Sequence, residues 1–343
     1  MKTNKILFSV LAAAGILFTA CSNDESVQLP QNAQAISFRT QGGTPTGIQR
    51  TPATTIDNID AFVVYGTDNV FGNTSLIFNK TTVARDVTSG IGTKTFTYAP
   101  TRYYDFNAAT SAFVAYSPVT AGIVNENTAT FLTSASFDYT VPQPNNSGDV
   151  TQIDLLVANT GTLSIPASTH SVQLDFKHAL ARVFVTAENS TKDPVFINAL
   201  TLENLEATGT LTFDTPTADA FSWTPTGDVK PYSYILADGG VLVAPTASPI
   251  LVTSMEQGMM ILPQVTSNIN DDNTFDATDF ALKVEYTFAN LGAQTKYILV
   301  KNGFEFEAGK QYRINIVFTG TDINFTITVV DFEDENITYP TNP

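Results

Sequence analysis

The chain has few of the cysteine and histidine side chains on which most metalloenzymes and redox proteins depend. Its 343 residues include one cysteine and two histidines. A single thiol cannot form an internal disulfide, and one Cys with two His cannot complete a four-ligand zinc site. We therefore expect neither a metal site nor a cofactor.

Basic residues are also scarce. Lys and Arg number 17 against 33 Asp and Glu, so the formal net charge is −16 at pH 7. Such a balance repels phosphate backbones, and no basic run offsets it locally. We expect no nucleic-acid partner.

Long apolar runs are confined to the amino terminus, where Lys2 and Lys5 precede an apolar run from Ile6 to Phe18. The run is shorter than the roughly 20 residues that a membrane helix needs, so it predicts a secretory signal over residues 1–20. The sequence Phe18-Thr19-Ala20-Cys21 is similar to the bacterial lipoprotein box. That similarity implies a lipid on Cys21, including palmitate; the alternative is plain secretion with a free thiol.

The residue types that are abundant in the chain favour β-strands. The chain contains 50 Thr, 24 Phe and 12 Tyr, which pack well on a pleated, half-buried surface. Short apolar alternations broken by Gly, Pro, Asn and Asp recur along it, and no segment sustains a helical period. One series of predicted strands covers residues 36–38, 59–65, 95–98, 113–116, 137–141 and 153–158. A second covers residues 172–176, 181–185, 211–213, 240–244, 259–262, 281–286, 312–318 and 323–330.

These two series predict an all-β protein with two consecutive β-sandwich domains. The Ser/Pro/Thr stretch 164–169 separates them, so we place the boundary near residue 168. The last strand alternates cleanly, with Ile323, Phe325, Ile327 and Val329 on one face. Such a terminal strand is either an ordinary member of its own sheet or a strand that enters another molecule's sheet.

Candidate catalytic and ligand sites are weak. His178 lies near Asp175, but no Ser sits in a nucleophile elbow, so a structural role is favoured. Residues 268–279 resemble a calcium loop in composition, but they lack its central Gly and closing Glu, which favours a solvated hairpin. Carboxylate pairs such as Glu305 with Glu307 arise by chance in so acidic a chain. We do not expect an enzyme.

One position stands out in the Gly/Thr/Pro-rich segment from Gln41 to Thr55, which separates the first strand from the body of the chain. Arg50 lies in it, and an exposed loop is what a protease needs. The bond between Arg50 and Thr51 is a candidate processing site; the alternative is an ordinary surface arginine.

Together these pieces resemble the fimbrillin family of Bacteroidetes, the pilin precursors of major and minor fimbriae that form protease-dependent (type V) pili. The resemblance rests on the Cys21 signal and on a series of motifs in order: AISF at 35–38, DAFVVYG at 60–66, FTYAPTRYY at 96–104, FVAYSP at 113–118, VQLDFKHALARVFV at 172–185, MILPQ at 260–264 and GKQY at 309–312. It implies two sandwiches of transthyretin-like type and export as a lipoprotein. It further implies that an Arg-specific, trypsin-like protease cuts the chain and removes the lipid with the first strand.

The resemblance therefore divides the chain into a signal (1–20), a lipidated leader with the first strand (21–50), an N-terminal sandwich (51–168) and a C-terminal sandwich (169–343). Loss of Ile36 and Phe38 is expected to leave an apolar groove with unpaired backbone groups. The alternating strand 323–330 of another subunit could fill it, giving a head-to-tail polymer used for adhesion.

The family resemblance implies that the precursor is held in the outer membrane through its lipid and that the processed chain is part of an extracellular fimbrium. Stalk and tip roles stay open, because the extension after Val330-Asp331-Phe332 is short. Arg50 argues against an anchor role, which returns if Arg50 is not cut. The competing hypothesis is a surface glycan-binding lipoprotein of a nutrient-uptake system. It would stack sugars on Trp223 or on Tyr103 and Tyr104.

Overall fold

The computed structural model of the chain describes a protein built of β-strands, with no helix in its described residues. It describes residues 35–41, 59–86, 95–105, 107–127, 134–143, 152–165, 171–236, 239–253, 258–266, 274–288, 291–319 and 322–331. Residues 34–343 cluster as one compact unit. The all-β prediction is confirmed.

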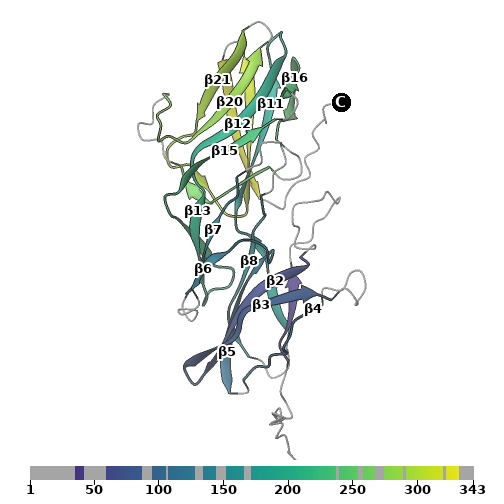
Figure 1. Ribbon diagram of the computed structural model, residues 1–343, viewed down its shortest axis with the longest axis vertical. Coiled ribbons are helices and arrows are strands. Elements are labelled where there is room, and N and C mark those ends of the chain that lie inside the picture. The colour runs from purple at the N-terminus through teal and green to yellow at the C-terminus, as the bar shows by residue number, and fades with distance from the viewer. Residues whose placement is uncertain are drawn as a thin grey trace, which may run out of the picture. The chain divides into compact units, whose positions relative to one another are not determined.

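The first large element is an antiparallel six-stranded sheet in the order β10-β8-β5-β2-β3-β4 (Figure 1). Its strands are β10 (Lys177–His178), β8 (Leu156–Ser164), β5 (Ala108–Ser117), β2 (Ala61–Val70), β3 (Asn73–Arg85) and β4 (Phe96–Thr97). A separate two-stranded sheet joins β1 (Ser37–Gln41) in parallel to β9 (Ser171–Asp175).

A four-stranded antiparallel sheet follows in the order β14-β13-β7-β6. Its strands are β14 (Phe221–Pro225), β13 (Thr208–Asp214), β7 (Ser134–Thr140) and β6 (Val124–Asn127). In Figure 1, β6, β7 and β13 lie between the six-stranded sheet and the strands of the C-terminal part of the chain.

Two five-stranded sheets form the C-terminal part. One has the path β17-β11-β23-β24, with β18 also paired to β11, and the other has the path β15-β12-β20-β21, with β16 also paired to β12. The first comprises β17 (Thr246–Leu251), β11 (Ala181–Asn189), β23 (Lys310–Thr319), β24 (Asp322–Asp331) and β18 (Met259–Ile261). The second comprises β15 (Val229–Ile235), β12 (Val195–Glu206), β20 (Ala281–Phe288), β21 (Gly292–Leu299) and β16 (Val241–Val243). A short pair joins β19 (Gln264–Val265) to β22 (Glu305–Phe306).

The described residues form two hydrophobic cores, and β2 contributes to both. Phe62 and Val64 face the smaller core, which β1 and β9 also line. Val63 and Tyr65, on the opposite face, belong to the larger core, which continues through the C-terminal sheets. Successive side chains of a strand point to opposite faces, so a strand buried on both faces reads as a continuous apolar run. This explains the unbroken burial of Phe62–Asp68.

Every predicted strand segment contains or overlaps an observed strand, but long strands such as β3 and β12 were not predicted. In β3 exposed and half-buried polar residues interrupt the apolar pattern, and in β12 the sequence Glu203-Asn204 interrupts the pattern where the register shifts. Sheet membership also departs from sequence order: β7 pairs with β13, and β9 pairs with β1 across the expected boundary at residue 168. The two-domain division stays a prediction.

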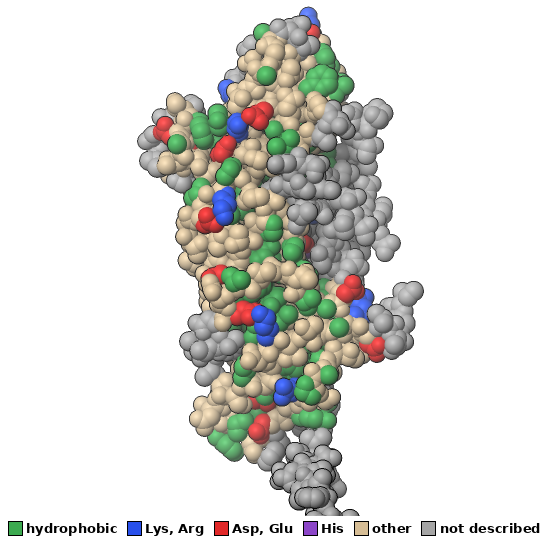
Figure 2. Space-filling view, in the orientation of Figure 1, with side chains coloured by type: hydrophobic (Ala, Val, Ile, Leu, Met, Phe, Trp, Pro, Cys, Tyr) green, Lys and Arg blue, Asp and Glu red, His purple; other side chains and the backbone are tan. Residues whose placement is uncertain are grey.

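In the described part of the chain, no helix is long and apolar enough to cross a membrane. Figure 2 shows one face on which charged side chains are scattered among polar surface and small hydrophobic patches.

Candidate functional site

β1 is the element around which the candidate site is built. Its alternation buries Ile36, Phe38 and Thr40, at 2%, 2% and 6% exposed, while Ser37 and Arg39 point outward. Burying the Ile and Phe side chains contributes about 3 to 6 kcal/mol before entropy is subtracted. The strand expected at the amino terminus therefore covers a hydrophobic floor.

Phe38 sits in the middle of an aromatic cluster, defined here as Phe62, Phe78, Tyr98 and Phe113. Its ring centroid lies 5.9, 5.2, 5.8 and 5.7 Å from theirs, all in edge-to-face geometry. Aromatic pairs of this kind add about 0.5 to 1.5 kcal/mol each beyond area burial. Phe38 is thus the main anchor of β1.

Gly66 of β2 makes room for this cluster. A Cβ at residue 66 would lie 2.6 Å from Phe113 Cδ1 and 3.1 Å from Phe78 Cδ2. Because these rings pack directly against the backbone of β2, only glycine fits without displacement.

Both backbone edges of β1 have partners. On one side Ser37 to Gln41 run parallel to Ser171 to Asp175. On the other side Ile36 N donates to Arg102 O (2.9 Å), and Tyr98 Oη donates to Ile36 O (2.5 Å). We call the space that β1 fills, between β9 and residues 98–103 and above the aromatic cluster, the β1 slot.

The chain connectivity makes β1 separable from the larger sheet. β1 pairs with β9, about 130 residues further along, and not with β2, the next strand in the sequence. The six-stranded sheet is complete without it. Removal of β1 would therefore uncover β9 and the aromatic cluster without breaking the pairing of that sheet.

The predicted C-terminal strand is present as β24, at the edge of its sheet. It pairs with β23 over ten residues, from Asp322 opposite Thr319 to Asp331 opposite Lys310. Its apolar face is incompletely covered: Ile323 is 6% exposed, whereas Phe325 and Val329 are 37% and 46% exposed and Ile327 is half-buried.

Three predicted site residues, Cys21, Arg50 and Thr51, lie outside the described residues. Lipid attachment and processing at these positions remain predictions.

His178 lies in β10, at the edge of the six-stranded sheet. Its Nδ1 lies 3.0 Å from Asp154 Oδ1, and both side chains are buried. The partner of Nδ1 is thus Asp154, whereas the sequence suggested Asp175. The pair links β10 to the segment before β8.

The calcium-like segment is only partly described: residues 274–278 are exposed or half-buried, and Asp279 at the end is buried. Asp279 is 0% exposed, and its carboxylate accepts a hydrogen bond from Asp276 N (2.9 Å), which closes a turn. Within the described ranges, no group of three or more His, Cys, Asp or Glu is arranged to hold a metal ion.

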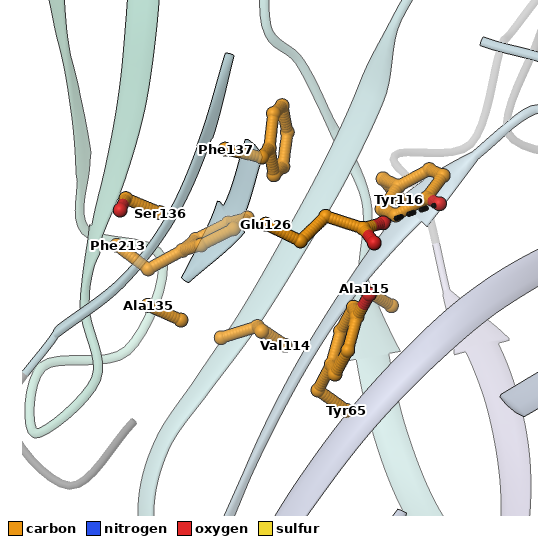
Figure 3. A pocket seen from close by; sticks show the side chains of 9 residues that line it. All are labelled: Tyr65, Val114, Ala115, Tyr116, Glu126, Ala135, Ser136, Phe137 and Phe213. Carbon is orange, nitrogen blue, oxygen red and sulfur yellow. Dashed lines mark hydrogen bonds between the residues drawn. The ribbon is translucent and has the colours of Figure 1, made fainter. Parts of the chain in front are cut away.

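A small cavity lies between β5 and β7, and Figure 3 shows its lining. Glu126 reaches into it, accepting a hydrogen bond from Tyr116 Oη (3.1 Å) while its other oxygen pairs with Lys80 Nζ (2.7 Å). Burial, and next the Glu126 carboxylate, raises the pKa of Tyr65. At about 10 Å³ the cavity has room for about one water molecule, so it is not a ligand site.

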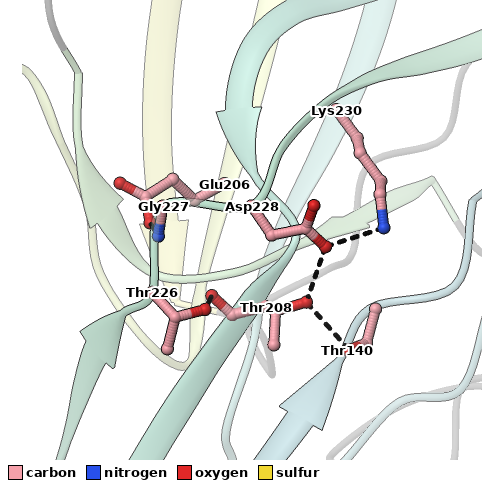
Figure 4. A network of polar contacts seen from close by, with 7 residues as sticks. All are labelled: Thr140, Glu206, Thr208, Thr226, Gly227, Asp228 and Lys230. Atoms are coloured by element: carbon pink, nitrogen blue, oxygen red, sulfur yellow. Dashed lines mark hydrogen bonds and ion pairs between the residues drawn. The ribbon is translucent and has the colours of Figure 1, made fainter.

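An exposed polar network joins the four-stranded sheet to the turn before β15 (Figure 4). Thr208 Oγ1 bonds Thr140 Oγ1 (2.9 Å) and donates to Asp228 Oδ2 (3.1 Å), which also pairs with Lys230 Nζ (2.7 Å). The Lys230 ammonium, followed by the Thr208 hydroxyl, lowers the pKa of Asp228. The turn closes with Gly227 N donating to Glu206.

Of the aromatics considered for sugar stacking, Trp223 and Tyr104 are half-buried, whereas Tyr103 borders an open hollow. Trp223 is half-buried and donates from Nε1 to Ala179 O (2.7 Å). Burial raises the pKa of Tyr104 to about 12. Tyr103 lines an open hollow with Arg102 and Leu76, but it also holds the bridge to Ala35.

Sequence reasoning found Ile36 and Phe38 but not the residues that surround them. Tyr98 is in a motif quoted above for family resemblance, yet its bond to the Ile36 carbonyl could not be foreseen. Phe78 and Phe113 lie on separate strands, and only the sheet brings them together.

The structure is an all-β fold whose first strand pairs outside the large sheet, and it can be compared with known proteins. A profile described as fimbrillin-like matches residues 49–331. The chain belongs to the fimbrillin-like family. No curated protein sequence matches it.

Solved structures share the fold. A fimbrial protein of Bacteroides vulgatus is 15% identical, with a TM-score of 0.61 over 87% of this chain and 99% of its own. A putative cell adhesion protein of Bacteroides uniformis is 17% identical, with a TM-score of 0.52 over 88% and 99% of the two chains. One from Bacteroides eggerthii is 13% identical, with a TM-score of 0.51 over 89% and 97%.

Proposed function

We propose that this protein is a non-enzymatic structural subunit of a cell-surface fimbria that serves in adhesion. It is exported as a lipoprotein anchored at Cys21 and processed after Arg50 by an Arg-specific protease. Processing releases β1, and a strand of the next subunit fills the vacated slot, so that repetition gives a head-to-tail fibre.

The burial of Phe38 in the β1 slot is the observation that carries this proposal. β1 lies outside the main sheet and is held by the buried side chain of Phe38. Removal of β1 therefore leaves a strongly apolar groove. Backbone groups of β9 lose their partners at the same time, and an open edge of this kind pairs with another strand.

The test is controlled processing of the purified precursor. Treatment with a trypsin-like protease should give a new amino terminus at Thr51 and then polymers, visible as ladders on gels and filaments in the electron microscope. The matched variant is Arg50→Ala, which should stay intact at this bond and monomeric. A cut chain that has lost residues 21–50 yet stays monomeric would contradict the proposal.

A further inference from the structure

We propose that the outer face of the five-stranded sheet that contains β12, β15 and β16 carries a contact surface for a second copy of this chain, and that this surface joins fibres side by side. We call it the outer patch. It consists of Phe196 and Ala199 of β12, Ile235 of β15 and Leu242 of β16. The fibre rests on the proposed function, whereas the patch itself does not.

The strand register brings the four side chains of the outer patch together. Leu242 lies opposite Phe196, and Ile235 lies opposite Ala199. Residues that lie directly opposite each other in an antiparallel pair share one face of the sheet. The outer patch is therefore a block of two neighbouring cross-strand pairs.

Strand β20, on the other side of β12, shows that this block faces away from the core. Thr287 lies opposite Phe196, and Glu285 lies opposite Ala199. Tyr286, between them on β20, is buried. Because successive side chains of a strand point to opposite faces, Phe196 and Ala199 point outward with Thr287 and Glu285.

The outer patch is more apolar than a solvated sheet face usually is. Phe196, Leu242 and Ile235 are 37%, 38% and 40% exposed, although the solvent face of an antiparallel sheet is commonly polar. Figure 2 shows hydrophobic side chains at the surface near the place of β16 in Figure 1. Exposed apolar side chains that lie together mark an interaction surface, whereas single ones do not.

Charge points to a second copy as the partner. The net charge of −16 makes two copies repel each other over most of their surfaces. The outer patch has no charged residue, and the two that β20 adds to this face, Lys283 and Glu285, pair with each other at 2.8 Å. In an isologous contact the same patch lies on both sides, so an uncharged apolar patch is complementary to itself.

The size of the outer patch makes the contact weak between single subunits. Three partly exposed side chains offer on the order of 200 Å² of apolar surface, far less than the roughly 800 Å² per partner of a stable interface. A fibre repeats the patch in every subunit, and many contacts acting together raise the affinity by about 10²- to 10⁴-fold. Single subunits therefore stay apart, and fibres associate.

Beads that carry many copies of the chain test this contact without polymerisation. The precursor with Arg50→Ala is produced without its signal and coupled to beads through Cys21, the only cysteine of the chain. At 0.15 M salt, where the Debye length is about 8 Å, we expect the beads to cluster, and light scattering measures the rate. The same precursor free in solution should sediment as a monomer.

The test variant combines Phe196→Thr with Leu242→Thr, because Thr keeps the strand propensity but removes apolar surface. The matched control combines Val229→Thr with Val265→Thr, whose parent side chains are 52% and 60% exposed and lie outside the outer patch. Beads of the test variant should cluster about tenfold more slowly than the parent, and those of the control within about twofold. Circular dichroism verifies folding; if the double variant is unfolded, Ile235→Thr replaces it, with an expected slowing of about threefold.

The outcomes separate this inference from the proposed function. Equal clustering of the test variant and the parent, or an equal loss in the control, overturns the outer patch. Parent beads that stay dispersed at 0.15 M salt overturn a second copy as the partner. Beads that cluster as expected, together with a processed chain that forms no polymer, support the patch and overturn the proposed function.

Filaments of the processed chain test the contact between fibres. In the electron microscope, parent filaments should lie side by side in bundles, and filaments of the test variant should lie singly. Thr51 amino termini verify that both chains are processed. Bundles of equal width in the parent and the test variant overturn the role of the outer patch in joining fibres.

Discussion

At the scale of single residues, the β1 slot depends on a few side chains whose packing is highly specific. Phe38 provides the apolar anchor, Gly66 the space for the rings, and Tyr98 a hydrogen bond to the strand backbone. Each of the three residues can be changed separately, so apolar burial, close packing and hydrogen bonding can be tested one at a time.

Phe38→Ala should lower the free energy of unfolding of the precursor by about 3 to 5 kcal/mol, because it empties the centre of the aromatic cluster. Denaturant unfolding measures the effect. Arg39→Ala, on the outer face of the same strand, is the control and should change stability by about 0.5 kcal/mol or less. Equal effects of the two changes would contradict the assigned faces of β1.

Gly66→Ala should destabilise the precursor by about 1 to 3 kcal/mol, because its Cβ would overlap Phe113 in a close-packed core. Thermal unfolding is the measurement. Ser75→Ala on the exposed face of β3 is the comparison and should be nearly neutral. A stabilising effect of Gly66→Ala would show that the cluster is loosely packed.

The buried carboxylate of Asp68 makes the free energy of unfolding depend on pH in a direction that can be predicted. Its side chain is 0% exposed, Oδ2 accepts from Asp105 N (3.0 Å), and Oδ1 has no partner among the described residues. Burial raises the pKa of Asp68 above its usual value. The charged form is therefore disfavoured in the fold, and this cost is present at neutral pH and disappears as pH falls below the unfolded pKa.

Asp68→Asn should accordingly be more stable than the parent at pH 7, with the difference shrinking as the pH approaches about 4. Urea unfolding at a series of pH values measures it. A difference that grows on acidification would mean that the carboxylate is stabilised in the fold.

At the level of secondary-structure elements, β1 fills the β1 slot without being a member of the six-stranded sheet. A synthetic peptide of residues 34–41 should therefore compete with the incoming strand and slow polymerisation of the processed chain. The same peptide with Phe38→Ser is the matched control and should be at least about tenfold weaker, because it loses the aromatic anchor. Light scattering follows both reactions, and equal inhibition would contradict the role of the cluster.

The elements also explain why sequence order is a poor guide to sheet membership. β7 precedes β8 in the chain yet pairs with β13, so the larger core runs without interruption from β2 and β5 into the C-terminal sheets. Strand alternation shows which residues of β7 face inward, but it does not identify the strand beside it.

At the scale of the whole molecule, net charge is the dominant electrostatic feature. The proposed cleavage after Arg50 would remove four basic and two acidic residues and leave 13 Lys and Arg against 31 Asp and Glu, a net charge of −18. Subunits of like charge repel one another at distances within the Debye length, which falls from about 30 Å at 0.01 M to about 8 Å at 0.15 M salt.

Polymerisation of the processed chain should therefore accelerate as salt is raised over this range. Light scattering measures the rate, and the appearance of the Thr51 amino terminus, followed separately, corrects for any effect of salt on the protease. A rate that falls with salt would indicate attraction between oppositely charged surfaces instead.

The all-β class, the position of the first and last strands, and the inward residues Ile36, Phe38 and Ile323 could be predicted from the sequence. This was possible because side-chain alternation is a local property with a period of two residues. The three-dimensional packing was needed to show that β1 runs parallel to β9, that Phe78 and Phe113 meet at Gly66, and that Asp154 rather than Asp175 contacts His178 Nδ1. These contacts join residues far apart in the chain, and they are selected by the packing of all the sheets together, which no local pattern contains.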